Sequence, residues 1–126
     1  MQFQDSSAIY QQIADYGIEQ VLHARWTPES RIPSVRSLAG EVGVNPNTVM
    51  RAYNFLQETG IIYNERGVGF FVAKDGLEEA ARLRRQNFID QTLPELIKTL
   101  DLLGIEAEEL VEIIQAFKKE TEDEDR

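Results

Sequence analysis

The sequence contains no cysteine and only one histidine among its 126 residues. The absence of cysteine excludes disulfide bonds, zinc–thiolate sites and thiol catalysis. The longest apolar stretch near the middle, residues 68–73, is far shorter than the roughly 20 residues of a membrane-spanning helix. The N-terminus also lacks the basic-then-apolar order of a secretory signal. We therefore expect an intracellular, cytoplasmic protein that has no membrane partner.

Basic residues are also few, since 13 lysines and arginines are outnumbered by 22 acidic residues, a formal net charge of −9. An acidic total usually argues against a nucleic-acid partner. The charge is uneven, however: residues 1–75 have a net charge of −2, and residues 76–126 have a net charge of −7. Much of this acid lies in residues 120–126, which we expect to form an acidic disordered tail. The total charge therefore does not identify the partner.

Apolar spacing and capping residues predict three helices in the first part of the chain. The first covers residues 9–23. After two prolines, Ser34 precedes a short amphipathic helix that ends at Gly43. Asn45 is suited to cap a third helix that runs to about Thr59. The short connection between the second and third helices is typical of a helix-turn-helix.

Two β-prone runs follow, residues 61–63 and 69–72, on either side of the turn-forming residues 64–68. This pattern predicts a β-hairpin. Three helices and a hairpin in this order make a winged helix-turn-helix, which we expect to occupy residues 1–75. The predicted fold class is thus mainly α with a small β-hairpin.

The second part of the chain has a helical pattern without any β signal. Apolar residues recur at steps of four and three, with Pro94 expected to kink or restart the helix. Gly104 breaks the chain, and a last helix begins at Glu106. We expect residues 76–119 to form a helical pair that mediates dimerisation. The predicted dimer interface consists of Ile89, Leu93, Leu96, Leu100, Leu103, Leu110, Ile113, Ile114 and Phe117.

An apolar stripe of this kind can instead belong to the core of a single chain. Two helices and a small neighbouring domain offer little surface against which to bury it. Left exposed over several turns, it would form an apolar patch larger than monomers usually show. A homodimer is therefore the favoured interpretation.

The third predicted helix has two faces. Its apolar side, which includes Tyr53, should face the core. Asn47, Arg51 and Asn54 form a polar stripe on the opposite side. Arginine can donate to guanine acceptors and asparagine can form two hydrogen bonds with adenine, so the stripe is suited to base edges. Each residue taken alone could be solvated surface, and it is the combination with the short turn and the hairpin that indicates DNA binding.

Other candidate contacts lie beside this helix. Arg36 is in the first turn of the second helix, which lies beside the sugar–phosphate backbone in helix-turn-helix complexes; the alternative is a surface ion pair with Glu41. At the hairpin tip, Gly67 permits close approach to DNA and Arg66 could enter a minor groove. Gly67 could also serve only the turn, and Asn45 could serve only as a helix cap.

These residues resemble the GntR family of bacterial transcription regulators over about residues 7–73. The short helical C-terminal part and the sequence from Asn45 to Val49 are more like its YtrA branch. The resemblance implies a winged-helix dimer that acts on double-stranded operator DNA. Twofold symmetry of a homodimer predicts a palindromic operator, and our first hypothesis for the function is a transcriptional repressor. The resemblance also places six residues where the family contacts DNA: Ser34, Arg36, Asn45, Asn47, Thr48 and Gly67.

Two departures from the family pattern lie in the third helix, where Pro46 and Met50 stand at positions at which many relatives carry arginine. The base contacts of those arginines cannot be transferred to this chain, although Arg51 could substitute for one of them. A third departure is Glu29, where the family usually has glycine. The complete predicted set of DNA contacts is Ser34, Arg36, Asn45, Asn47, Thr48, Arg51, Asn54, Arg66 and Gly67.

No nucleophile–base pair or metal-ligand cluster is present in the pattern, so we expect neither an enzyme nor a metal or other cofactor. His23 is interpreted as a surface residue. The larger effector domain of other GntR branches is missing, so we expect no metabolite pocket, and the existence of a small-molecule effector stays open. The alternative function is a winged-helix adaptor that binds proteins without contacting DNA, and the net charge of −9 is its main support.

Overall fold

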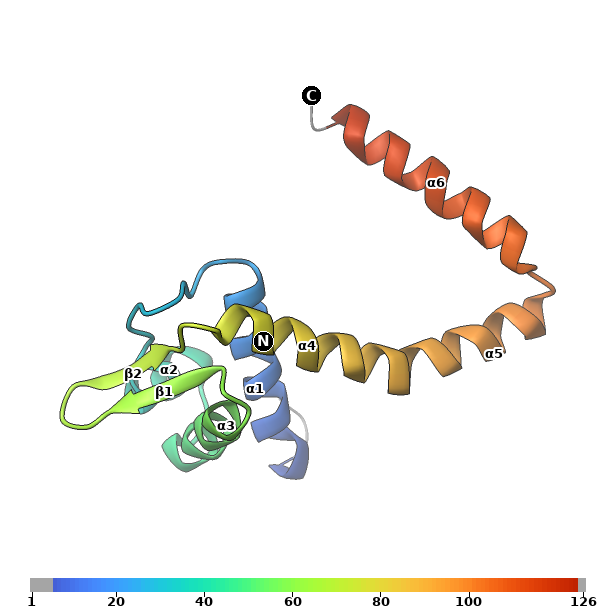
Figure 1. Cartoon of the computed structure of the whole chain (residues 1–126). Coiled ribbons are helices and arrows are strands. Elements are labelled where there is room, and N and C mark those ends of the chain that lie inside the picture. The colour runs from blue at the N-terminus through green and yellow to red at the C-terminus, as the bar shows by residue number, and fades with distance from the viewer. Residues whose placement is uncertain (1–5, 125–126) are drawn as a thin grey trace. The chain divides into compact units, whose positions relative to one another are not determined.

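The computed structural model describes residues 6–124. The elements are α1 (Ser6–Leu22), α2 (Val35–Val42), α3 (Pro46–Glu58), β1 (Ile62–Glu65), β2 (Gly69–Val72), α4 (Gly76–Asn87), the π-helical turn η1 (Phe88–Thr92), α5 (Leu93–Leu103) and α6 (Ala107–Glu124) (Figure 1). The predicted fold class, mainly helical with one antiparallel hairpin, is confirmed. None of the helices in residues 6–124 is both long enough and apolar enough to cross a membrane.

The chain divides into two compact units, residues 1–85 and 86–126. The boundary lies later than the predicted one at residue 75, because the first turns of α4 pack against the core of the first unit. Ala80 is fully buried there, and Leu83 packs against the same core. A Cβ atom added at Gly76 would lie only 2.5 Å from the carbonyl oxygen of Ile61, so α4 starts in direct contact with the backbone before β1.

The core of the first unit takes one face from each of the three N-terminal helices. Val49, Tyr53 and Leu56 of α3 are fully buried, as the helical periodicity predicts. Ile18 of α1 and Leu38 of α2 are equally inaccessible to solvent. The opposite face of α3 is therefore left free to carry polar residues.

Tyr53 joins α3 to two other segments. Its hydroxyl donates to the carbonyl oxygen of Pro33 at 2.6 Å. Its ring meets the ring of Phe70 edge to face, with centroids 5.0 Å apart. Burial raises the pKa of the Tyr53 hydroxyl, so it stays a donor. One side chain thus holds the lead-in to α2 and strand β2 against α3.

The two helices of the helix-turn-helix begin and end where capping chemistry predicts. Ser34 Oγ accepts a hydrogen bond from the backbone N–H of Ser37 at 3.1 Å. Asn45 Oδ1 accepts one from the backbone N–H of Asn47 at 2.8 Å. Gly43 ends α2 with φ 74°, a left-handed conformation that glycine adopts without steric cost. These caps determine where α2 begins and ends and where α3 begins.

Strands β1 and β2 form the wing, a hairpin in which Glu65 lies opposite Gly69. β1 is longer than predicted, because Asn64 and Glu65 belong to the strand and not to the turn. The turn is tight: the N–H of Val68 donates to the carbonyl oxygen of Glu65 at 2.9 Å, and Gly67 has φ 81°. A positive φ at the third residue of a turn is the reason for glycine there.

In the second unit, none of residues 86–124 is buried. A π-helical turn precedes α5, in which the N–H of Leu93 donates to the carbonyl oxygen of Phe88. The cause is Pro94, which has no N–H and whose ring crowds the preceding turn. The predicted restart at Pro94 therefore takes the form of a π turn. This turn contains Ile89 and ends just before Leu93, so it interrupts the regular spacing of the apolar stripe.

The predicted disordered tail is wrong for residues 120–124, which belong to α6; residues 125–126 lie outside the described residues. Glutamate, which supplies three of these five residues, is a good helix former, as are the two lysines that precede them. Lys118 and Glu122 are also spaced so that opposite charges attract on one helix face. Local helix propensity therefore outweighs the repulsion among the acidic side chains.

Candidate nucleic-acid interface

The predicted polar stripe lies together on the exposed face of α3. Asn47, Arg51 and Asn54 are all exposed, and Thr48 is half-buried at the edge of this face. Met50 lies among them and is 37% exposed, so one apolar side chain belongs to the same surface. The face therefore presents hydrogen-bonding groups around a small apolar contact.

Arg51 is held to one side of this stripe by a contact that the sequence of α3 does not reveal. Its guanidinium carbon lies 3.9 Å from the centroid of the Tyr10 ring in α1, a cation–π contact. Stacking uses the flat face of the guanidinium and leaves the N–H groups at its edge available. Arg51 is thus directed toward α1, away from the centre of the stripe.

The capping roles of Ser34 and Asn45 use only part of each side chain. In both residues an oxygen accepts a backbone hydrogen bond, at the N-terminus of α2 or α3. The hydroxyl hydrogen of Ser34 and the amide hydrogens of Asn45 are not used by these bonds. A cap and an external contact are therefore compatible at both positions.

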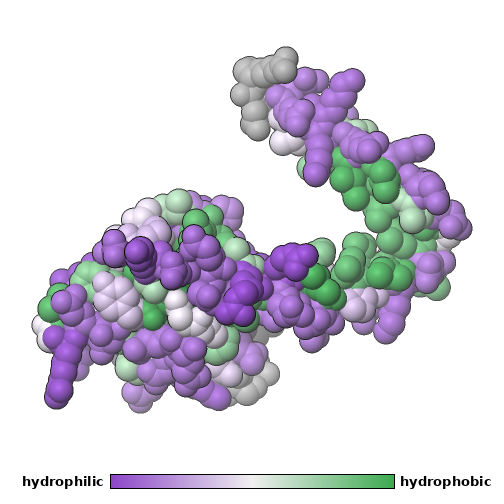
Figure 2. All heavy atoms as spheres, viewed as in Figure 1, coloured by the Kyte–Doolittle hydropathy of each residue, from purple (hydrophilic) through white to green (hydrophobic). Residues whose placement is uncertain are grey.

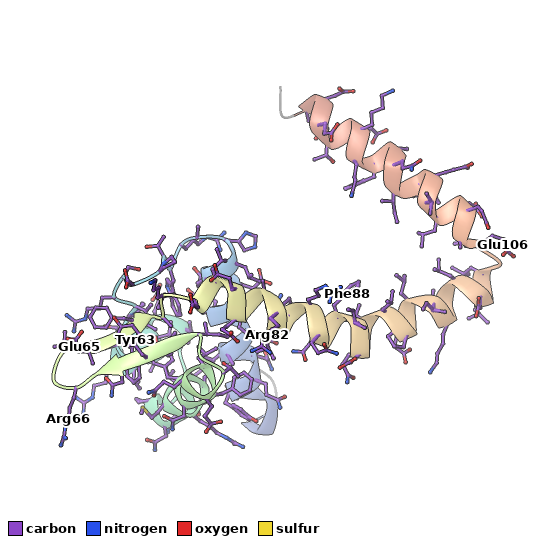
Figure 3. All side chains as sticks on the ribbon, viewed as in Figure 1. Tyr63, Glu65, Arg66, Arg82, Phe88 and Glu106 are labelled. Atoms are coloured by element: carbon purple, nitrogen blue, oxygen red, sulfur yellow. The ribbon has the colours of Figure 1, made fainter. Side chains whose placement is uncertain are left out.

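The wing tip carries Arg66 and Gly67. Figure 3 shows Arg66 extending from the turn between β1 and β2, away from the body of the sheet. No atom lies within 4 Å of a Cβ built at Gly67, so its backbone is open to solvent. The positive φ of Gly67 establishes the turn role, and the open surface is compatible with close approach of another molecule.

A groove of about 300 Å³ lies between the wing and the N-terminus of α2. Arg36, which we expected to contact DNA, lies in its wall. The groove also contains Arg31, which sequence reasoning missed. Its lining includes Arg31, Ser34, Arg36, Val68, Gly69 and Phe70.

No carboxylate in residues 6–124 pairs with the arginines of this surface, which are Arg31, Arg36, Arg51 and Arg66. The ion pairs in this part of the chain lie elsewhere, on α1, α4 and α5, and the alternative pairing of Arg36 with Glu41 is not formed. Residues 1–85 carry nine basic and ten acidic side chains, whereas residues 86–126 carry four and twelve. The acid is therefore concentrated outside the unit that holds the candidate interface.

Another cluster anchors the last turn of α4 to α1. Arg84 forms an ion pair with Glu19 and donates to the backbone carbonyl oxygen of Asp15 at 3.5 Å. The Arg84 guanidinium lowers the pKa of the Glu19 carboxyl, and burial raises the pKa of Asp15. His23 Nε2 lies 3.0 Å from the Glu19 carboxylate on the exposed surface, in agreement with its predicted surface role.

Known proteins match the chain over the elements that build this interface. The family model of bacterial regulatory proteins, gntR family, matches residues 9–72. YhcF of Bacillus subtilis, an uncharacterised HTH-type transcriptional regulator, is 34% identical over 92% of this chain and 94% of its own length. The HTH-type transcriptional repressor YtrA of the same organism is 37% identical over 87% of this chain and 84% of its own.

Solved structures agree with these matches. A putative transcriptional regulator of the GntR family from Bacteroides thetaiotaomicron superposes with a TM-score of 0.75 at 39% identity, over 90% of this chain and 99% of that one. The DNA-binding domain of AraR, solved in complex with operator ORR3, superposes with a TM-score of 0.51 at 26% identity, over 58% of this chain and 86% of that one.

Proposed function

The chain belongs to the GntR family of bacterial regulatory proteins and is of the YtrA-like type, and we propose that it represses transcription by binding a palindromic operator as a homodimer. It is a DNA-binding transcription regulator and not an enzyme. The observation that carries the proposal is the exposed polar face of α3 on a fold similar to that of the AraR domain solved with its operator, together with arginines of this unit that pair with no carboxylate in residues 6–124. Such a regulator acts in the cytoplasm, where bacterial DNA lies.

The division of charge answers the main objection to this function. The net charge of −9 favours an adaptor that avoids DNA only if the acid surrounds α3. Residues 1–85 are nearly neutral, and the arginines near α3 have no described carboxylate partner. Local charge therefore favours a polyanionic partner over the adaptor alternative.

Exposed apolar side chains in the second unit support a homodimer. Phe117 is 68% exposed and Leu103 is 65% exposed in the single chain. Both belong to the predicted interface, which a second copy would cover. Three further apolar residues, Ile97, Leu102 and Val111, are exposed on the same two helices and were absent from the predicted set. Figure 2 shows hydrophobic surface running along α5 and α6. Helices with no fully buried side chain gain little from packing, and an apolar surface of this extent is typical of an interface, so both observations support a partner surface.

A second copy of the chain is the partner that matches the function. Two copies related by a twofold axis present two α3 helices to DNA, and half-sites about one helical turn apart then form a palindrome. The acidic charge of residues 86–126 opposes this pairing, and salt relieves the repulsion. Added salt should consequently strengthen the dimer. The same salt should weaken DNA binding, because DNA binding releases counterions from the duplex.

The operator part of the proposal is tested by selecting bound sequences from a random DNA pool with the full chain. We expect an enriched palindrome whose half-sites lie about one helical turn apart. Scrambled versions of the enriched sequence serve as the control. Enrichment of a single, unpaired half-site, or equal affinity for the scrambled duplexes, would contradict the proposed operator.

The dimer part is tested with two variants that each add one carboxylate to α6. Ile114→Glu places it on the apolar face, whereas Gln115→Glu places it on the adjacent polar face. Sedimentation equilibrium should show a dimer for the wild type and for Gln115→Glu, and a monomer for Ile114→Glu at the same concentration. A monomeric wild type, or an Ile114→Glu variant that stays dimeric, would defeat the assignment of this face.

A further inference from the structure

Arg31 is positioned by the wing and not by a helix. The segment before α2 runs beside β2: the N–H of Ile32 donates to the carbonyl oxygen of Phe70 at 2.9 Å, and the N–H of Val72 donates to that of Ser30 at 3.0 Å. Arg31 itself pairs with Phe71 in an antiparallel bridge. The backbone of Arg31 is therefore fixed to the edge of the hairpin.

The guanidinium of Arg31 lies across Gly69, which has no side chain to displace it. A Cβ atom built at Gly69 would lie 2.9 Å from Nε of Arg31 and 3.2 Å from Nη2. These distances are shorter than an ordinary van der Waals contact, so the arginine occupies the space that any other residue at this position would fill. The backbone of Gly69, at the start of β2, is therefore the surface against which the Arg31 guanidinium packs.

Arg31 and Arg36 both line the groove between the wing and α2, and both are exposed. Neither forms an ion pair with a carboxylate in residues 6–124. Glu65 is the cross-strand neighbour of Gly69 and is the wing carboxylate that shares this face of the hairpin, yet it does not come within 4 Å of either arginine. Two cations are thus held at one groove without an internal counterion.

The lining of the groove has two kinds of surface. The guanidinium groups supply planar sets of N–H donors, which suit the non-bridging oxygens of a phosphate. Val68 and Phe70 supply apolar surface, which suits the carbon atoms of a deoxyribose. We propose that this groove binds one sugar–phosphate unit of the operator backbone, with its phosphodiester held by Arg31 and Arg36; the proposal rests on the proposed function of DNA binding.

Such a contact carries no base information of its own. It fixes where the wing and α2 sit along the strand, and therefore the register in which α3 meets the bases. Arg31 should accordingly contribute to the affinity for every duplex, whatever its sequence. This separates it from a residue that reads base edges, whose removal would weaken binding only at particular base pairs.

The first test measures the affinity of the full chain for the selected operator and for a scrambled duplex over a range of salt concentrations. Arg31→Ala should weaken binding to both by about tenfold and reduce the slope of log K against log salt by about one unit. Arg31→Lys should keep most of the slope, because lysine also neutralises a phosphate. Arg82→Ala is the matched control, since Arg82 is exposed and paired with Glu79 on α4, and it should change neither quantity.

The second test neutralises single phosphates of the operator as methylphosphonates. One position should weaken wild-type binding by about tenfold and weaken Arg31→Ala binding clearly less, because only the Arg36 contact to that phosphate is then left. An unchanged salt slope in Arg31→Ala, a loss confined to particular base pairs, or no methylphosphonate position that depends on Arg31 would each overturn the proposal.

The two levels of the proposal fail in different ways. If the wild type bound the operator no better than scrambled DNA, the proposed operator would be wrong, while the Arg31 contribution could still be read from the salt slope on the scrambled duplex. If the wild type preferred its operator and Arg31→Ala kept the same slope, only the groove assignment would be wrong. Circular dichroism spectra and melting temperatures of all variants show that lost binding is not lost folding.

Discussion

Replacing Tyr53 by phenylalanine removes one buried hydroxyl and nothing else. The ring stays in its edge-to-face contact with Phe70, and no cavity of side-chain size is created. The lost hydrogen bond to Pro33 spans 2.6 Å and joins α3 to the segment that leads into α2. A neutral hydrogen bond contributes about 1 kcal/mol net, and leaving its acceptor without a partner costs more.

Pro33 is half-buried, so water can reach its carbonyl in part and limit the penalty. We therefore expect Tyr53→Phe to lower the free energy of unfolding by about 1–2 kcal/mol, which corresponds to a fall in melting temperature of about 5 °C. The assay is urea unfolding at one fixed protein concentration, because the proposed dimerisation would make stability depend on concentration.

Tyr63→Phe is the matched control for this measurement. Tyr63 is 39% exposed and its ring stacks on Phe71, so it loses the same hydroxyl from a solvated site. Its unfolding free energy should stay within about 0.5 kcal/mol of the wild type. Equal losses in the two variants, or a Tyr53→Phe protein as stable as the wild type, would refute the role assigned to the buried hydrogen bond.

Further expectations follow from the glycines and from the anchor of α4. Gly76→Ala places a methyl group 2.5 Å from the Ile61 carbonyl oxygen. It should lower the free energy of unfolding in urea by at least about 2 kcal/mol. Gly40→Ala lies in α2, where the added methyl group meets no atom within 4 Å, and it should raise the free energy of unfolding by about 0.5–1 kcal/mol. A stable Gly76→Ala protein would contradict this contact. Because Arg84 lowers the pKa of Glu19 in the folded state, the pair stabilises the fold above the usual glutamate pKa near 4.5, and this contribution is lost as the pH falls through the lowered value. The melting-temperature difference between wild type and Glu19→Gln should therefore be largest at neutral pH and vanish in acid; a constant difference would show that the ionised pair is not its cause.

Features that depend on neighbouring residues could be predicted from the sequence. Ser34 and Asn45 cap their helices by bonding N–H groups only two or three residues away, and Gly43 needs only its own freedom of φ. The buried face of α3 also follows from the spacing of apolar residues within one helix. The helix-turn-helix and the polar stripe were therefore accessible without a structure.

Features that depend on distant contacts could not be predicted in this way. The position of Arg31 results from its pairing with β2, and the direction of Arg51 results from Tyr10 in another helix. Gly76 and Ala80 look like the beginning of the C-terminal helical part, yet they pack in the first unit, which moves the boundary. A glycine beside an arginine far away in the chain gives no sequence signal of a shared groove.

Residues 86–124 have no buried member, and this bears on how the amount of active regulator is controlled. Proteases cleave a backbone that has opened locally. In a single copy, few buried contacts oppose such opening in these helices. If the proposed homodimer forms, single copies would be degraded faster than assembled ones, and the amount of surviving protein would rise more steeply than the rate of synthesis. Such a threshold would limit how much single-copy regulator is available to bind DNA.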